Sequence, residues 1–162
     1  MILWPAGAAL VIVWNVFRDP ALDHRVVVLG ALVPDVIDLP TGGAGPAHTL
    51  LASVAVLVVV MAATRGSRPA RRRWLALPIG MLVHLAVDGA WTLTATFWWP
   101  ILGTALDDPL PALDRPLAVT VGLEAVGLAA VAWFGVRFGL ADPGRWGRFW
   151  RTGRLVADRA GR

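Results

Sequence analysis

The feature that most constrains this chain is a series of long runs without a charged side chain. The chain has 162 residues, 57% of them hydrophobic, and a mean hydropathy of +0.64, whereas a soluble domain is usually about 45–50% apolar. A helix crosses a bilayer with about 17–25 apolar residues, or fewer where partner helices bury it. The pattern predicts an integral membrane protein of about five short hydrophobic helices. The uncharged runs cover residues 1–17, 26–34, 49–64, 74–83, 89–106, 116–123 and 125–136.

The predicted fold is all-α, with a polytopic transmembrane domain over 1–140 and a basic tail over 141–162. Segment 26–40 is short and contains a proline and two aspartates, so either a full crossing or a re-entrant helix fits it. The first segment lacks the basic start and the clear cleavage site of a signal peptide, so we expect it to remain as a helix. The five helical segments are expected at 2–17, 26–40, 48–64, 74–91 and 116–137.

The arginines indicate how the chain is oriented. All 15 basic residues are arginines, and they gather beside the hydrophobic segments, which is how a membrane protein marks its cytoplasmic side. Loops 18–25 and 65–73 and the C-terminal tail are therefore predicted to be cytoplasmic. Loops 41–47 and 92–115 are then outside. We expect a multi-pass protein of the cytoplasmic membrane with a cytoplasmic C-terminus, and no nucleic-acid partner in spite of the net charge of +4.

The tail has a pattern of its own. Trp146, Phe149 and Trp150 share one face of a helix, with arginines around them. A basic helix with aromatic residues on one face lies among anionic lipid headgroups. A disordered basic tail that only fixes the topology is the alternative.

Six ionisable side chains lie in the hydrophobic segments or at their ends, where each is costly without a partner or a function. Asp35 and Asp38 are three residues apart, and His84 and Asp88 are four apart, so each pair shares one face of a helix. The predicted topology brings all six to a similar depth near the outer side. The six are Asp35, Asp38, His48, His84, Asp88 and Glu124.

Imidazole nitrogens and carboxylate oxygens are ligands for Zn²⁺, Mn²⁺ and Fe. A divalent cation would keep ionised the carboxylates that repel one another when buried. Single residues have simpler explanations, because His84 and Asp88 can hydrogen-bond within their helix and Asp35 can cap a helix end. The joint pattern favours a metal site, with zinc expected and manganese or iron as alternatives. His24 lies in a loop on the opposite side and is not expected to be a ligand.

Four segments, in order, resemble the YdjM-like family of membrane-bound metal-dependent hydrolases, also described as LexA-binding inner-membrane hydrolases. The segments are similar to that family's LGxLLPDxxD, RGxTHSLL, GYLSHLLLD and LLWP, and they span about half of the chain. The resemblance implies a small helical membrane protein with a metal site at Asp35, Asp38, His48, His84 and Asp88. In this chain the segments read LGALVPDVID (29–38), GPAHTLL (45–51), GMLVHLAVD (80–88) and FWWP (97–100).

Two departures from the family pattern stand out. The first hydrophobic segment has no histidine, which many members have there. Pro46 and Ala47 stand where the family has a basic residue before its Thr-His pair.

The leading hypothesis is a membrane-embedded, metal-dependent hydrolase whose site lies near the outer leaflet. His48, His84 and Asp88 are the expected metal ligands, with Asp35 and Asp38 as further ligands or as residues that orient them. The metal would lower the pKa of a bound water for attack on an ester or phosphoester, and Asp38 or Glu124 could act as general base. The predicted depth fits a lipid or lipid-linked substrate.

Two other classes remain open at this stage. Intramembrane Asp, Glu and His also mark proton and ion pathways, although here they stop on the outer side. A non-enzymatic assembly protein could hold a purely structural metal. The chain has no cysteine, which excludes disulfides and thiolate metal sites. A phosphate-binding glycine loop, a nucleophile elbow and an HExxH motif are absent from the sequence. The sequence does not determine the oligomeric state.

Overall fold

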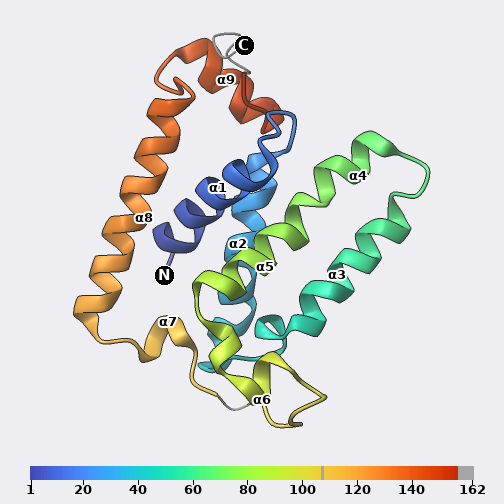
Figure 1. Cartoon of the computed structure of the whole chain (residues 1–162), viewed down its shortest axis with the longest axis vertical. Helices are drawn as coiled ribbons and strands as arrows, with labels where there is room; N and C mark the ends of the chain where they lie inside the picture. The colour runs from blue at the N-terminus through green and yellow to red at the C-terminus, as the bar shows by residue number, and fades with distance from the viewer. Residues whose placement is uncertain (107, 157–162) are drawn as a thin grey trace.

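The computed structural model describes residues 1–106 and 108–156, and these residues are largely helical (Figure 1). The prediction of an all-α chain is confirmed for them, since strand-type pairing within them is limited to one isolated bridge between Gly43 and Pro109. Asp107 of the predicted outer loop and Arg159 and Arg162 of the predicted tail lie outside the described residues. The longer helices are α1 (Leu3–Phe17), α2 (His24–Asp38), α3 (Leu50–Ala63), α4 (Arg68–Trp74), α5 (Ala76–Val87), α8 (Leu117–Arg137) and α9 (Pro143–Thr152).

Shorter elements complete the described chain. They are α6 (Thr94–Phe97), α7 (Pro111–Asp114) and the 3-10 turns η1 (Leu39–Thr41), η2 (Pro46–His48) and η3 (Ala90–Thr92). The helices α1, α2, α3, α5 and α8 match the five predicted hydrophobic segments to within a few residues. Side-chain caps set two of their starts, because Asp23 accepts from the main-chain N–H of Arg25 and Thr49 accepts from that of Ala52.

The basic stretch 65–73, expected to be a loop, is largely helical. Ser67 caps the start of α4 by accepting from the main-chain N–H of Ala70, and Pro69 occupies the first turn. Leu75 keeps helical dihedral angles, so α4 runs into α5 as one rod (Figure 1). Arginine has a high helix propensity, so a stretch rich in arginine can form a helix as well as a loop.

Glycines let pairs of helices approach closely. A Cβ atom at Gly30 of α2 would overlap the carbonyl oxygen of Leu77 in α5, and one at Gly80 of α5 would overlap that of Val27 in α2. Gly7 of α1 and Gly127 of α8 are equally close to the facing main chain. Close approach through small residues is the usual packing of helices in membranes. It leaves α1, α2 and α5 at the centre, with α3 and α8 on either flank (Figure 1).

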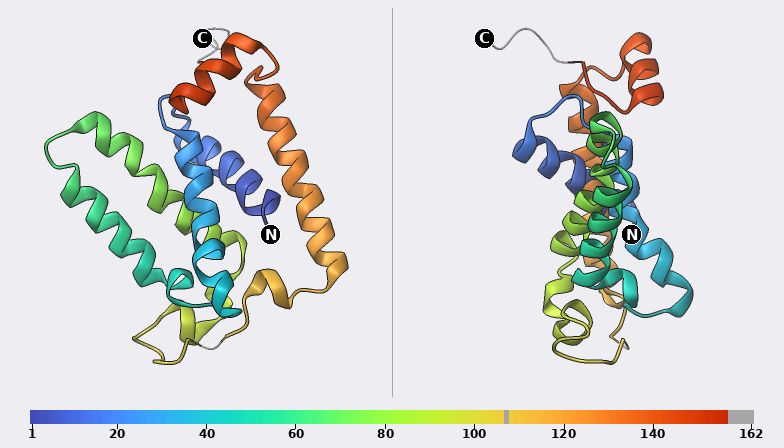
Figure 2. Two further views of the ribbon diagram at one scale, coloured as in Figure 1. Left: turned by 180° about the vertical axis from the view of Figure 1, so that it is seen from behind. Right: turned by 90° about the vertical axis from the view of Figure 1, so that its right-hand side faces the viewer.

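The connections segregate to the two ends of the helices, and the side of a membrane that each end faces stays a prediction. At one end, Arg72 of α4 binds the Asp19 carboxylate, and the Leu155 N–H of the tail donates to the Pro20 carbonyl. At the other end, the Ala44 N–H donates to the Asp108 carbonyl, which joins loops 41–47 and 92–115. Figure 2 shows α9 and the α3–α4 turn at the first end and α6 at the second.

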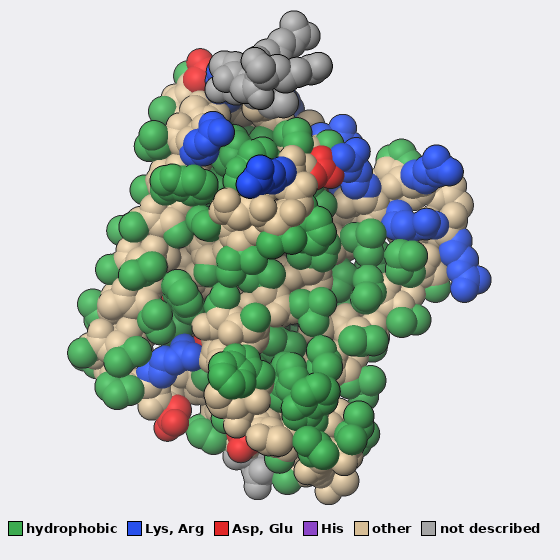
Figure 3. Space-filling model, in the orientation of Figure 1, with side chains coloured by type: hydrophobic (Ala, Val, Ile, Leu, Met, Phe, Trp, Pro, Cys, Tyr) green, Lys and Arg blue, Asp and Glu red, His purple; other side chains and the backbone are tan. Residues whose placement is uncertain are grey.

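Hydrophobic side chains cover much of the outer surface between these ends (Figure 3). Among the described helices, α8 is the one long and apolar enough to cross a membrane, with a mean hydropathy of 1.9 and only 11% of its apolar window buried. The shorter helix α3 is also apolar, yet only Ser53 and Val60 of its residues are buried. Neither helix therefore has the polar face that a surface helix of a soluble protein presents to water.

The described part of the tail, residues 141–156, is mostly helical. Its helix α9 brings Trp146, Phe149 and Trp150 to one face, where the Trp146 ring stacks on the other two. Phe149 also packs against the cluster of Leu10, Phe134, Phe138 and Leu155. The helical alternative predicted for the tail is thus confirmed for residues Pro143–Thr152.

Candidate metal centre

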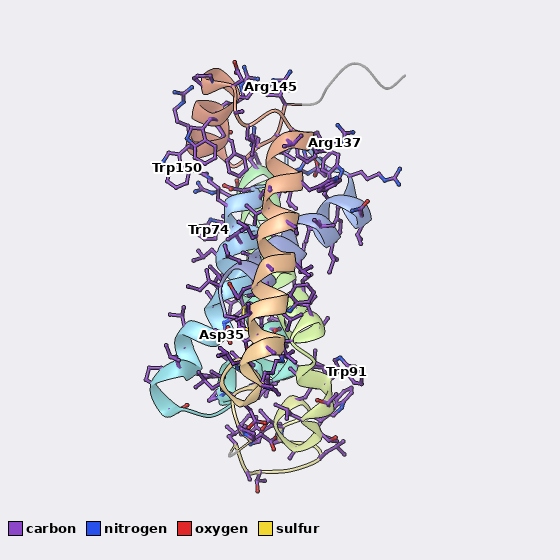
Figure 4. All side chains as sticks on the ribbon, turned by 90° about the vertical axis from the view of Figure 1, so that its left-hand side faces the viewer. Asp35, Trp74, Trp91, Arg137, Arg145 and Trp150 are labelled. Atoms are coloured by element: carbon purple, nitrogen blue, oxygen red, sulfur yellow. The ribbon has the colours of Figure 1, made fainter. Side chains whose placement is uncertain are left out.

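Four side chains from three parts of the fold converge on one point. Asp35 comes from α2, His48 from the turn η2, and His84 and Asp88 from α5 and its C-cap. One ligand atom from each of the four lies within 4.8 Å of all the others. Sequence reasoning chose all four, and the fold brings them together at the end opposite α9, where Figure 4 labels Asp35 far from Arg145 and Trp150.

The distances between the facing atoms suit a metal ion. The Nε2 atoms of His48 and His84 are 3.4 Å apart, and each lies 3.6 Å from Asp35 Oδ1. His84 Nε2 is 4.0 Å from Asp88 Oδ2. Ligands about 2.0–2.2 Å from a tetrahedral zinc ion are about 3.4 Å from one another. The four atoms thus need only small movements to surround one ion.

Helix packing positions His84. The glycine contact between α2 and α5 brings the two main chains together, and His84 Nδ1 reaches the Ala31 carbonyl oxygen at 2.6 Å. A carbonyl oxygen only accepts, so Nδ1 carries the proton and donates it. The lone pair of a neutral His84 ring is then on Nε2, which faces the centre.

His48 is held in the same way by Asp38. Its Nδ1 lies 2.7 Å from Asp38 Oδ2 and donates to that carboxylate. Asp38 also accepts from the main-chain N–H groups of Gly45, Ala47 and His48, so it fixes the whole turn that carries the histidine. Asp38 therefore orients His48, which is one of the three roles expected for it, and it is not itself one of the four clustered residues. Carboxylate-to-histidine hydrogen bonds of this kind accompany most metal-bound histidines.

The two remaining members of the cluster, Asp35 and Asp88, are carboxylates with one oxygen each turned toward the histidines. Asp35 Oδ1 and Asp88 Oδ2 are buried and have no hydrogen-bond partner among the described residues. Burying such an atom without a partner costs about 1–3 kcal/mol, and more when it is charged. A divalent cation would satisfy both oxygens and the two histidine lone pairs at once.

Arg115 was not chosen from the sequence. Its Nη1 donates to Asp88 Oδ1 at 2.7 Å and its Nη2 to the Asp88 carbonyl at 2.6 Å, so the free Oδ2 faces the centre. One signal could have identified it, since it is the lone arginine of the otherwise acidic 92–115 loop. It lies at the same end of the helices as the cluster, next to Asp88.

Two residues considered from the sequence lie elsewhere. Glu124 caps the start of α1, where its Oε1 and Oε2 accept from the main-chain N–H groups of Ile2 and Leu3 at 2.8 and 3.0 Å. It is not part of the four-residue cluster, so the suggested role as general base lacks support. His24 is buried at the opposite end of α2 and bonds to the Leu22 carbonyl, as expected for a residue outside the site.

Cavities of different character flank the cluster. Asp35 lines a largely apolar cavity of about 300 Å³ with Leu32, Leu39 and Leu110. Asp88 and Arg115 line a more polar one of about 290 Å³. Of the four ligands, Asp35 has the most exposed side chain, at 13% against 3% or less for the others. The centre is accessible mainly from the side of Asp35.

No family model, curated protein or solved structure matches this chain. The proposed function therefore rests on the geometry of the site.

Proposed function

We propose that this chain is a multi-pass protein of the cytoplasmic membrane that binds one divalent metal ion, zinc first, and hydrolyses an ester or phosphoester of a lipid-like substrate. One observation carries the proposal. Two histidine Nε2 atoms and two unpartnered carboxylate oxygens face one point, while the other polar atoms of both histidines and of Asp88 are engaged elsewhere.

The exposed apolar surface supports the membrane location. Helices α3 and α8 present valines and leucines outward, among them Val58, Val136 and Leu117, exposed by 60%, 85% and 78%. A soluble monomer rarely exposes such a surface. The basic connections at one end fit the cytoplasmic side, which leaves the metal centre toward the outer leaflet.

The clustered residues have different roles in this proposal. His48, His84 and Asp88 would hold the ion, and Asp38, the Ala31 carbonyl and Arg115 keep these three side chains in place. A bound divalent cation supplies Lewis acidity and a water acidic enough to act as nucleophile near neutral pH. Asp35, the most exposed carboxylate of the four, would serve as the general base that holds a proton during hydrolysis.

The flanking cavities support an amphiphilic substrate. The apolar cavity beside Asp35 suits a hydrocarbon chain. The polar cavity is lined by Arg115 together with Asp88 and Asp114, and the guanidinium N–H groups that do not bind Asp88 can donate to a phosphate or carboxylate group. An ester between an apolar tail and an anionic headgroup would bring its scissile bond to the ligands between the two.

A structural metal is the second candidate, favoured by one observation. Four protein ligands can close a tetrahedral shell, as in structural zinc sites, whereas catalytic sites keep one position open. The two candidates differ in what Asp35 does.

Asp35→Asn separates them. For the enzyme, the purified variant keeps its metal and its Tm but loses at least about 100-fold in the hydrolysis rate of an anionic amphiphilic ester, since general-base catalysis contributes about 10²–10⁴-fold. For the structural site, metal content and Tm fall together. A zinc-loaded wild type that cleaves neither carboxylic esters nor phosphoesters of any amphiphile offered would contradict the hydrolase proposal.

A further inference from the structure

The end of the molecule opposite the metal centre contains a pocket lined by arginines. Its volume is about 440 Å³, and it lies between the start of α2, the helix α4 and the end of α9. Basic side chains gather at this end of the surface (Figure 3). Five arginines from these three parts of the chain line it, namely Arg25, Arg72, Arg73, Arg151 and Arg154.

Carboxylates neutralise only part of this charge. Asp23 pairs with Arg25 at 2.9 Å and with Arg73 at 3.2 Å, and Asp19 pairs with Arg72. Burial raises the pKa of the Asp23 carboxyl, but the hydrogen bond and charge of Arg25 outweigh burial, and its pKa lies below its usual value. Asp23 therefore stays ionised. Within residues 1–106 and 108–156, no acidic group pairs with Arg151 or Arg154, so the pocket keeps excess positive charge.

The pocket is built by tertiary contacts and does not depend on a loose tail. The main-chain N–H of His24 donates to the Gly153 carbonyl at 2.9 Å, and that of Leu155 donates to the Pro20 carbonyl at 2.9 Å. The Arg25 guanidinium donates to the Trp150 carbonyl. These bonds fix the end of α9 against the start of α2 and hold Arg151 and Arg154 beside Arg25.

An apolar groove adjoins the pocket. It measures about 490 Å³, runs between α2, α8 and α9, and shares Arg25 with the pocket. Leu29, Val131 and Trp150 are among its walls, and its lining is almost wholly apolar. Trp74 lines the pocket and Trp150 lines the groove, and both are exposed. Tryptophan is enriched where a membrane protein meets the surface of the bilayer. A free phosphate compound would use the pocket alone, whereas a lipid would use both the pocket and the groove.

We propose that the arginine pocket binds the phosphate group of an anionic phospholipid from the cytoplasmic leaflet, with an acyl chain in the adjoining groove. Arginine forks match phosphate oxygens in pairs, which lysine or a diffuse basic surface does not reproduce. The lipid would also join α2, α4 and α9, whose arginines it neutralises. The proposal rests on the proposed membrane location and is independent of the metal centre.

Native mass spectrometry of the full chain, released from a nonionic detergent, tests this directly. Phosphatidylglycerol and phosphatidylcholine with identical acyl chains are offered in equal amounts. We expect the wild type to retain phosphatidylglycerol in about tenfold preference, since charge-assisted hydrogen bonds give differences of this size. In the double variant Arg151→Gln and Arg154→Gln the preference falls to about one. Both side chains are exposed, so the variant is expected to fold, and Tm checks this.

The matched control removes two exposed arginines outside the pocket, Arg65→Gln with Arg148→Gln, and is expected to keep the wild-type preference. The double variant Arg151→Lys and Arg154→Lys keeps the charge without the guanidinium fork and should recover only part of the preference for phosphatidylglycerol. An equal loss in the control, or no preference in the wild type, would overturn the proposal. Recovery of the wild type in the membrane fraction tests the membrane location separately.

Inorganic pyrophosphate distinguishes the two sources of phosphate. Displacement of bound phosphatidylglycerol by pyrophosphate, in the wild type but not in the double glutamine variant, would support recognition of the phosphate group itself. Pyrophosphate binding without any preference between the two lipids would overturn the assignment to a lipid.

Discussion

At the scale of single residues, the metal centre depends on the groups that hold its ligands. Each histidine uses Nδ1 for an acceptor, the Asp38 carboxylate or the Ala31 carbonyl, and so turns Nε2 inward. Arg115 does the equivalent for Asp88 by binding its other oxygen. These partners restrict the ligands before an ion arrives, which reduces the entropy lost on binding.

Asp38→Asn tests this role. The substitution keeps the shape of the side chain but removes the charge that accepts from His48 Nδ1 and from three main-chain N–H groups. We expect zinc affinity to fall by about 10–100-fold, which is typical when the partner of a liganding histidine is changed. Competition with a chromophoric chelator measures it. Asp142→Asn, at the N-cap of α9, is the control and should leave affinity unchanged.

Arg115→Gln tests the anion contact proposed for the polar cavity. Loss of the guanidinium should lower kcat/KM for an anionic amphiphilic ester by about 10-fold or more, because a charged hydrogen bond contributes about 1.5–3 kcal/mol. A neutral ester of the same chain length serves as the matched substrate and should be affected less. Equal losses for both substrates would mean that Arg115 acts only through Asp88.

The residue scale also shows how far sequence alone could reach. The spacing of His84 and Asp88 on one helix face identified that pair. The energetic cost of an ionisable side chain in a membrane segment identified Asp35 and His48. The Ala31 carbonyl could not be predicted, because a main-chain atom leaves no mark on the sequence. Arg115 was missed because helix spacing does not apply to a loop, although it is the lone arginine of an otherwise acidic segment. Glu124 looked like a site residue because a carboxylate in a hydrophobic segment is costly, whereas its contacts show it to be a helix cap.

At the scale of elements, the crossing of α2 and α5 determines whether the centre can form. Gly30 and Gly80 let the two main chains touch, and His84 lies one turn beyond Gly80. The bond from His84 to Ala31 exists because of that contact. The hydrophobic runs were enough to predict these helices. Their pairing was not predictable, because apolar segments without a directional pattern fit several neighbours equally well.

Gly80→Ala should therefore destabilise the protein and weaken its metal binding. The new Cβ atom would overlap the Val27 carbonyl oxygen and force the helices apart, at a cost of about 1–3 kcal/mol. Gly122→Ala in α8 is the control, because nothing lies within 4 Å of its Cβ position, and it should be neutral or stabilising by up to about 1 kcal/mol. Thermal unfolding followed by tryptophan fluorescence gives both values. A Gly80→Ala protein as stable as wild type would contradict the packing.

At the scale of the whole molecule, charge and chemistry are divided between two ends. Basic connections and the arginine pocket lie at one end, and the candidate metal centre lies at the other, with exposed apolar helices between them. α1, α2 and α3 have 15, 15 and 14 residues, or about 21–23 Å at 1.5 Å per residue. They are shorter than the roughly 30 Å hydrocarbon core, so the centre would lie at or below the outer surface of the bilayer.

The proposed orientation can be tested with single cysteines, because the chain has none of its own. Gly66→Cys lies in the α3–α4 turn, and Thr104→Cys lies in the 92–115 loop, both exposed. An impermeant maleimide should label Thr104→Cys in intact cells and Gly66→Cys only after permeabilisation. Labelling of both in intact cells would exclude the multi-pass orientation proposed for this chain.

Metal content is the most direct test of the central claim. The detergent-purified wild type is analysed by inductively coupled plasma mass spectrometry beside His84→Ala and His24→Ala, the second replacing a buried histidine outside the centre. We predict about one equivalent of zinc, manganese or iron in the wild type and in His24→Ala, and less than about a tenth in His84→Ala. No metal in the wild type after reconstitution with these ions, or equal content in His84→Ala, would contradict the account.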